Sequence, residues 1–353
     1  LAPLTTVGNL PFRRLCKGMG ADVTLGEMAL ASRIVEGNAG EWALFRRHKS
    51  EDCFGVQIAG GWSDQVAKCV ELLEENCSAD FIDLNCGCPL EGVCNKGMGA
   101  ELLDRTRRLQ EIVTVASGST SLPFTVKIRV GHYEDEERRH AHSLIPQLSK
   151  WGAAAVTLHG RSRQQRYSRE ADWDYIRTCA KAGQKAGVPV MGNGDVLTWE
   201  DYHNRGEGVA SCMIARGALI KPWLFKEIKE KKYWDIRSSE RLDIMKDFCS
   251  YGLDHWGSDS LGVEKTRSFL LEWQAWLCRY VPVGVLEVLP PRLNHRSPGF
   301  VARDDLEQLM ASSQVEDWIK LSEMILGPAP PGLNFVPKHR SSGKASAETQ
   351  AEG

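Results

Sequence analysis

The sequence has no apolar run of the roughly 20 residues that a membrane-spanning helix needs, and no basic-then-apolar signal segment at its start. Its 11 cysteines are an odd number, so they cannot all pair within the chain, and a disulfide scaffold is not expected. These absences indicate a reducing compartment, the cytoplasm or the nucleus, and no membrane partner. The formal net charge of −2 argues against nucleic-acid binding over the whole protein surface, although local basic patches can still bind phosphates.

What the sequence does contain is enough apolar material for a large core. With 353 residues, of which 42% are hydrophobic, the chain fits one large domain plus a smaller one. It opens at Leu1, without Met and already inside an apolar stretch, which predicts a fragment of a longer protein.

Short β-branched segments alternate with longer amphipathic ones. The expected strands are 2–5, 22–27, 54–59, 81–85, 124–130, 154–160, 188–194 and 211–217. The expected helices between them include 64–76, 106–116, 135–151 and 173–182, with Ser63 and Asp172 as N-caps. This alternation predicts an α/β fold, a (β/α)₈ TIM barrel, with a doubly wound open sheet as the structural rival.

After the last strand the pattern becomes helical. We expect a barrel at 1–232, a helical domain at 233–327 and a disordered tail at 328–353. Apolar residues between Val263 and Tyr280 recur at spacings of three and four, which predicts packing against neighbouring helices. The tail is rich in Pro, Gly, Ser and Ala and has little apolar surface to bury.

Polar residues follow the expected strands, at the end of a barrel where active sites lie. Asn193, Gly194 and Asp195 lie at the end of the seventh expected strand, and Ala215 and Arg216 at the end of the eighth. These two glycine-containing turns are typical of a phosphate cradle, although glycine also serves ordinary turns.

A second group would face the barrel mouth from earlier strands. Lys127 alternates with apolar residues in "TVKIRV", and a buried ammonium needs an anionic partner. The pyrimidine ring of a reduced flavin is such an anion, and the Gln57 amide could contact the same edge. Pro3, Leu4 and Thr5 lie at the end of the first expected strand.

Three cysteines lie in "DLNCGCPLEGVCNKGMGAEL", residues 83–102. Cys86, Cys88 and Cys94 lack the spacing and the nearby His of a zinc site, so no metal site is expected. Cys88, followed by Pro89, could serve as a nucleophile or as a general acid, and the residues alone leave both roles open. We expect Cys86 and Cys94 to be packing or surface residues.

The stretch "HGRSRQQRYSR" after the sixth strand is the most basic part of the sequence. The position of His159, Arg161 and Arg166 at a strand end favours phosphate contacts, to a cofactor or to a nucleic-acid backbone. For Arg163 and Arg169 we expect a solvated face.

The motifs "APLT", "VQIAG", "DLNCGCP", "KGMGAEL", "TVKIRVG", "LHGRSRQQRYS", "GNGDV" and "IARGAL" occur in this order. Together they resemble the tRNA-dihydrouridine synthase family over residues 1–232, and "HRSPGF" further on resembles its eukaryotic dihydrouridine synthase 3 type. Members of that type carry N-terminal CCCH zinc fingers, which these residues do not include.

The resemblance implies roles for the residues that match. Cys88 would be the catalytic proton donor. The implied FMN contacts are Pro3, Leu4, Thr5, Gln57, Lys127, His159, Asn193, Gly194, Asp195, Ala215 and Arg216. Positions near the uridine or the tRNA phosphates would be Asn85, Arg129, Arg161 and Arg166.

The resemblance also implies a reaction. NADPH would reduce FMN, a hydride would pass to carbon 6 of an extruded uridine, and Cys88 would protonate carbon 5. The expected substrate is tRNA at position 47 of the variable loop, with mRNA as a further RNA class. Basic residues of the helical domain, Lys265, Arg267, Arg279, Arg292 and Arg296, would hold the tRNA. The alternatives are a flavin barrel acting on a free pyrimidine and a non-catalytic RNA-binding module.

Overall fold

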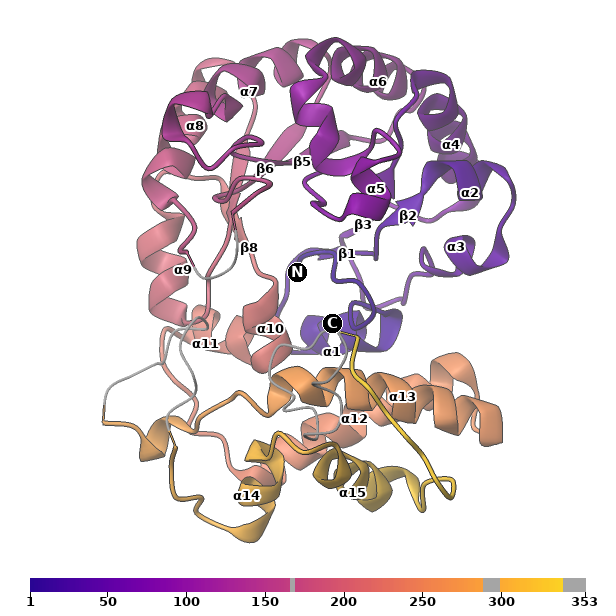
Figure 1. Ribbon diagram of the computed structural model, residues 1–353, viewed down its shortest axis with the longest axis vertical. Helices are drawn as coiled ribbons and strands as arrows, with labels where there is room; N and C mark the ends of the chain where they lie inside the picture. The colour runs from indigo at the N-terminus through magenta and orange to yellow at the C-terminus, as the bar shows by residue number, and fades with distance from the viewer. Residues whose placement is uncertain (166–168, 288–298, 339–353) are drawn as a thin grey trace, which may run out of the picture.

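The computed structural model describes residues 1–165, 169–287 and 299–338 (Figure 1). Its strands are β1 (Thr24–Leu25), β2 (Ala29–Leu30), β3 (Phe54–Ala59), β4 (Phe81–Cys86), β5 (Phe124–Arg129), β6 (Ala155–His159), β7 (Val190–Asn193) and β8 (Ser211–Met213). They run parallel in the order β1-β3-β4-β5-β6-β7-β8, and β2 pairs with β3. The expected α/β barrel architecture is confirmed.

Helices surround this sheet and fill the space below it in Figure 1. The barrel part contains α1 (Leu10–Gly18), α2 (Ala31–Val35), α3 (Ala39–Ala43), α4 (Ser63–Asn76), α5 (Glu91–Cys94), α6 (Thr106–Gly118), α7 (Ala141–Lys150), α8 (Trp173–Lys185), α9 (Trp199–Gly206), α10 (Arg216–Ile220) and α11 (Leu224–Glu230). The later helices are α12 (Ser238–Trp256), α13 (Ser260–Leu277), α14 (Asp305–Ala311) and α15 (Val315–Leu326). Short 3₁₀ helices are η1 (Gly99–Asp104), η2 (Glu136–Arg138) and η3 (Val283–Val285).

The expected first strand, residues 2–5, is not a strand in the structure. It lies between β8 and β1, because the Ala2 amide donates to the Ile214 carbonyl at 2.8 Å and the Leu1 amino group donates to the Val23 carbonyl at 2.7 Å. A ladder does not continue from there, since Pro3 has no N–H and the chain turns at Thr6, whose φ is 74°. The segment therefore joins the two ends of the sheet without regular pairing.

The expected helices differ from the observed ones at their ends. The side chain of Asp172 accepts a hydrogen bond from the Tyr175 amide and caps α8, as predicted. Ser63 is instead the first residue of α4, and Trp62 occupies the N-cap position without a side-chain bond. The expected helix 135–151 is divided into η2 and α7, because Arg139 adopts an extended backbone conformation between them.

The barrel and the later helices share one apolar core. Trp273 of α13 is fully buried where the two parts meet, with its ring 5.5 Å from that of Phe12 in α1. Its indole N–H donates to the Leu219 carbonyl of α10 at 2.9 Å. The apolar stripe between Val263 and Tyr280 thus packs as expected.

The first part of the expected disordered tail has defined contacts. Leu333 and Phe335 pack against a small cluster that includes Trp318 and Leu271, and the Lys338 amide donates to the Glu272 carboxylate. Residues 328–338 therefore bury more apolar surface than their composition suggested, and residues 339–353 lie outside the described ones.

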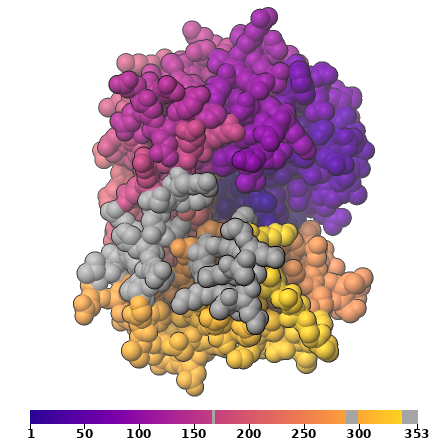
Figure 2. All heavy atoms as spheres, in the orientation of Figure 1, coloured from indigo at the N-terminus to yellow at the C-terminus, as the bar shows by residue number. Residues whose placement is uncertain are grey.

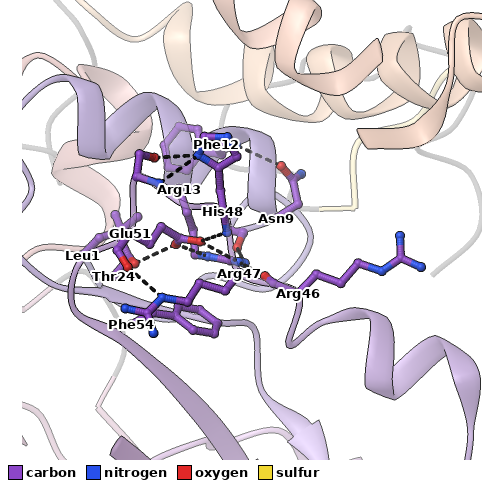
Figure 3. Close-up of polar contacts among 12 residues, drawn as sticks. Leu1, Asn9, Phe12, Arg13, Thr24, Arg46, Arg47, His48, Glu51 and Phe54 are labelled. Carbon is purple, nitrogen blue, oxygen red and sulfur yellow. Dashed lines mark hydrogen bonds and ion pairs between the residues drawn. The ribbon is translucent and has the colours of Figure 1, made fainter. Parts of the chain in front are cut away.

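A buried ion pair ties α1 to the loop before β3 (Figure 3). Arg13 donates to Glu51 at 2.8 Å, and both side chains are almost fully buried. Glu51 also accepts from the Thr24 hydroxyl at 2.7 Å and the His48 amide at 2.9 Å, while Arg13 donates to the Arg46 carbonyl at 2.6 Å. Donors bind the Glu51 carboxylate from several sides, as a buried charge requires.

No helix in the described part of the chain is long and apolar enough to cross a membrane.

Candidate active site

A cavity of about 320 Å³ opens at the carboxyl ends of the barrel strands. In Figure 2 the surface is hollowed between the barrel and the later helices, with N-terminal atoms, drawn in indigo, deep in the recess. The residues that line the cavity at the strand ends include Pro3, Leu4, Thr5, Gln57, Asn85, Cys88, Lys127, Arg129, His159, Asn193, Gly194, Asp195, Ala215 and Arg216. All the residues predicted to contact FMN thus line one cavity together with the predicted proton donor.

Cys88 lies in a turn that the protein holds from three sides. The Cys88 amide donates to the Asn85 side-chain oxygen at 2.8 Å. The Cys88 carbonyl accepts from the Ala100 amide at 3.0 Å and from the Cys94 thiol at 3.4 Å. A Cβ on Gly99, whose φ is 62°, would lie 2.7 Å from this carbonyl, so only glycine allows the loop to approach so closely.

The protonation state of Cys88 favours an acid over a nucleophile. Burial raises the pKa of its thiol, although a backbone hydrogen bond and the charges of Arg129 and Lys127 lower it in part. A thiol with a raised pKa carries its proton at neutral pH, whereas a nucleophile needs the thiolate. Cys94 is buried and donates to the Cys88 turn, so it does more than the packing expected of it.

The polar floor of the cavity is a chain of side-chain hydrogen bonds. Asn85 donates to the Gln57 oxygen at 2.9 Å, and Gln57 donates to the Asp83 carboxylate at 2.7 Å. Thr125 also donates to Asp83, at 2.6 Å. The four side chains come from β3, β4 and β5, which are neighbours in the sheet.

Lys127 of β5 brings a positive charge to the same part of the cavity. Burial lowers the pKa of its ammonium to about 8, with a further lowering from Arg129, while Asp83 and Cys88 raise it in part. An anion bound in the cavity would restore the preference for the charged form. Lys127 lines the cavity, as expected for a side chain that faces the barrel mouth, and its contact with an anionic ligand stays a prediction.

The opposite wall is formed by the two glycine turns. Gly194 and Asp195 have φ of 131° and 53°. A Cβ on Gly217 would lie 2.3 Å from the Val196 carbonyl, so the turns after β7 and β8 are packed tightly against each other. Asp195 pairs with Arg216 at 3.0 Å, which fixes this guanidinium beside the turn.

In the basic stretch after β6, Arg161 is internal, whereas Arg169 is exposed and pairs with Glu134. Arg161 is fully buried, donates to the Arg169 carbonyl and pairs with Asp195 at 2.6 Å. It does not line the cavity, so the expected contact with a substrate phosphate does not fit its position. Arg166 lies outside the described residues. His159 lines the cavity, and burial together with the neighbouring cations lowers its pKa well below the usual value, so its imidazole is neutral.

Arg129 lines the cavity but also supports the backbone. Its guanidinium donates to the Gly87 carbonyl at 2.6 Å and to the Ser162 carbonyl at 2.9 Å. Among the basic residues expected to hold tRNA, Arg267 is buried and bonds Ser322 and the Gly327 carbonyl, so it is not available at the surface. Lys265 is exposed, and Arg292 and Arg296 lie outside the described residues.

Sequence reasoning missed several residues at this site. Met28, Val196, Leu197, Met213 and Gly217 also line the cavity. Asp83, which opens the "DLNCGCP" motif, was given no role although it accepts from Gln57. The signal available was its type, because a carboxylate inside an apolar parallel strand is costly without partners. Within the described residues no group of three His, Cys, Asp or Glu side chains could hold a metal ion.

Comparisons with known proteins agree on one family. The family model described as "Dihydrouridine synthase (Dus)" matches residues 1–260. The chain is 56% identical over 351 residues to the Oryza sativa protein "tRNA-dihydrouridine(47) synthase [NAD(P)(+)]-like", covering 99% of this chain and 51% of that protein. It is 56% identical to the Mus musculus protein of the same name, with 97% and 53% coverage.

A fungal relative is more distant. The Coprinopsis cinerea "tRNA-dihydrouridine(47) synthase [NAD(P)(+)]" is 48% identical over 363 residues, with 99% of this chain and 53% of that protein covered. The chain therefore spans about half the length of the curated relatives it matches.

Proposed function

This chain belongs to the dihydrouridine synthase family, and we propose that it carries the FMN-dependent activity that reduces a uridine of tRNA to 5,6-dihydrouridine, with NADPH as reductant. The observation that carries the proposal is the single cavity in which Cys88, Lys127 and Gln57 meet the two glycine turns. The names of the relatives support position 47 as the target uridine.

The cavity suits an elongated ligand with a heterocycle at one end and a phosphate at the other. Gln57, Asn85 and Lys127 offer amide groups and an ammonium on the side of β3 to β5. The turns at Gly194 and Ala215 would hold the phosphate through backbone N–H groups, with Arg216 adding a charge. When bound and reduced, FMN supplies a hydride to carbon 6 of the uracil ring.

The protein supplies the proton. The Cys88 thiol, kept protonated by its raised pKa, would donate a proton to carbon 5 of the same ring. Lys127 would stabilise the negative charge of the reduced flavin. A base stacked in RNA cannot reach this depth, so the uridine must be extruded, at a cost of a few kcal/mol. The neutral His159 can hydrogen-bond a ligand without adding another positive charge to the cavity.

We also propose that the region from 233 to 327 acts as a helical tRNA-binding domain beside the barrel, with Lys265 among its exposed cations. The 11 free cysteines support work in a reducing compartment, the cytoplasm or the nucleus. The same chemistry would act on a uridine of mRNA that can be extruded in the same way.

A single-turnover experiment tests the proposal. The protein is loaded with FMN, reduced with NADPH without oxygen, and mixed with a tRNA transcript that lacks dihydrouridine. We expect reoxidation of the flavin together with the gain of two hydrogens on one uridine, read by mass spectrometry of the nucleosides. Reoxidation by free uracil but not by tRNA would favour the free-pyrimidine alternative, and a protein that takes up no FMN would favour a non-catalytic RNA-binding module.

A further inference from the structure

Asp83 lies beneath the cavity rather than in it. Its side chain is 2% exposed, and it is absent from the cavity lining, whereas Gln57 and Asn85 both line the cavity. Asp83 accepts hydrogen bonds from Gln57 on β3 and from Thr125 on β5. Asp83 can therefore influence a ligand through the hydrogen bonds to Gln57 and Thr125 and through its charge on Lys127.

In its ionised form the Asp83 carboxylate has only acceptors, and this form fixes the direction of the whole hydrogen-bond chain. The Gln57 nitrogen must face Asp83, so the Gln57 oxygen faces the Asn85 nitrogen. The Asn85 oxygen is then left to accept from the amides of Gly87, at 3.1 Å, and Cys88, at 2.8 Å. One charge thus orients two side-chain amides and the turn that carries the thiol.

The order of donors and acceptors in the cavity follows from this direction. Gln57 keeps one N–H that Asp83 does not use, and its oxygen keeps one lone pair beside the bond from Asn85. A planar heterocycle whose edge alternates carbonyl oxygen and ring N–H matches such a pair. A flipped Gln57 would present the same groups in reversed order.

Burying the Asp83 carboxylate costs more free energy than burying a neutral side chain, so packing alone does not explain a carboxylate at this position. Burial raises the pKa of Asp83, while the bonds from Gln57 and Thr125 and the charge of Lys127 lower it; Cys86 on the same strand is the other titratable neighbour. A hydroxyl or an amide could satisfy Thr125 and Gln57 at a lower desolvation cost. Only the anion excludes the reversed order.

We propose that Asp83 is a positioning residue that sets the hydrogen-bonding order of Gln57 and Asn85 toward the heterocycle and holds the Cys88 turn. The inference rests on the proposed function, because the heterocycle it would orient is the flavin ring. It adds to that function a determinant that does not touch the ligand.

The test compares Asp83→Asn with Glu51→Gln. Both replacements neutralise a buried carboxylate at the centre of a hydrogen-bond network and keep its shape, but only Asp83 leads to the cavity. FMN binding to the apoprotein is measured by fluorescence quenching, and the alkylation rate of Cys88 by peptide mass spectrometry. We expect Asp83→Asn to weaken FMN binding about tenfold, to shift the visible spectrum of the bound flavin, and to raise Cys88 alkylation about fivefold. Glu51→Gln should leave all three unchanged in protein that is still folded.

A double-mutant cycle with Gln57→Leu tests the route. If Asp83 acts through Gln57, adding Asp83→Asn to Gln57→Leu should weaken FMN binding less than twofold further. Full additivity, equal effects of Asp83→Asn and Glu51→Gln, or no effect of Asp83→Asn on binding, spectrum and alkylation would each overturn the proposal. Failure of the proposed function looks different, because the unmodified protein would then bind no FMN or would not reduce uridine.

Discussion

Glu51 and Asp83, two of the buried carboxylates in the described part of the chain, are bonded in different ways. Glu51 has a buried guanidinium partner, Arg13, and its remaining bonds come from Thr24 and a backbone amide (Figure 3). Asp83 accepts from the neutral side chains of Gln57 and Thr125. The first network closes on itself between α1 and β3, whereas the second continues through amides to a cavity wall.

The difference shows how a buried charge can serve stability or a site. A buried carboxylate paired with arginine satisfies both charges internally, and removing either partner is costly. A buried carboxylate bonded to a side-chain amide fixes the orientation of that amide, and the amide in turn fixes the orientation of the next hydrogen-bonded group. The following experiments separate these two uses.

The largest effect is expected for Arg13→Met, which leaves Glu51 buried without its cation. We expect the free energy of unfolding in urea to fall by about 3–5 kcal/mol. The control is Arg14→Met, because Arg14 pairs with the exposed Asp254 and should cost no more than about 1 kcal/mol. Equal losses for the two variants would contradict the structural role given to the Glu51 network. FMN affinity, measured in folded protein, should not change.

Cys88→Ala tests the end point of the other network. Dihydrouridine formation in a single turnover should fall about 10²- to 10³-fold, because the proposed proton donor is lost. FMN binding and flavin reduction by NADPH should remain, since neither needs the thiol. Replacement of the buried Cys86 by Ala is the matched control and should change stability more than the rate of reduction. An unchanged rate in Cys88→Ala would remove Cys88 from the mechanism.

Lys127 gives the binding of an anionic ligand at the site a pH dependence. Its pKa is about 8 in the ligand-free protein, and a bound anion would hold the proton to higher pH. The affinity for reduced FMN should therefore fall about tenfold between pH 7 and pH 9, because binding then requires uptake of a proton. Lys127→Met should bind more weakly at pH 7 and lose this dependence. If Lys127→Met and Lys265→Met follow pH alike, another group is responsible.

The sequence predicts the hydrogen-bond network at the cavity better than the network around Glu51. Strand ends in a barrel converge, so the positions of Gln57, Cys88 and Lys127 after successive apolar segments were enough to predict a common cavity. The residue type of Asp83 indicates a buried carboxylate that needs partners. Only the pairing of β4 with β3 and β5 shows which side chains it meets.

Burial explains the remaining differences. The sequence placed Arg161 and Arg267 with the phosphate-binding cations, because arginine at a strand end or in a basic helix is usually exposed. Both instead bond carbonyl groups inside the protein. The hydrogen-bond partners are distant in sequence or belong to the backbone, and neither leaves a residue-type pattern to detect.

Cys94 supports the Cys88 turn in a way that the sequence did not predict, and its replacement should have the smallest effect of these variants. Its buried thiol donates to the Cys88 carbonyl at 3.4 Å, whereas the neighbouring bond from Ala100 is a stronger amide bond to the same oxygen. Cys94→Ala should therefore slow dihydrouridine formation only about twofold to fivefold, and Cys94→Ser, which keeps a donor, should restore most of the rate. Alkylation of Cys88 should rise in the alanine variant and not in the serine variant. If both variants slow the reaction equally, the volume of the Cys94 side chain rather than its hydrogen bond holds the turn, and the hydrogen bonds that hold it would be those with Asn85 and Ala100 alone.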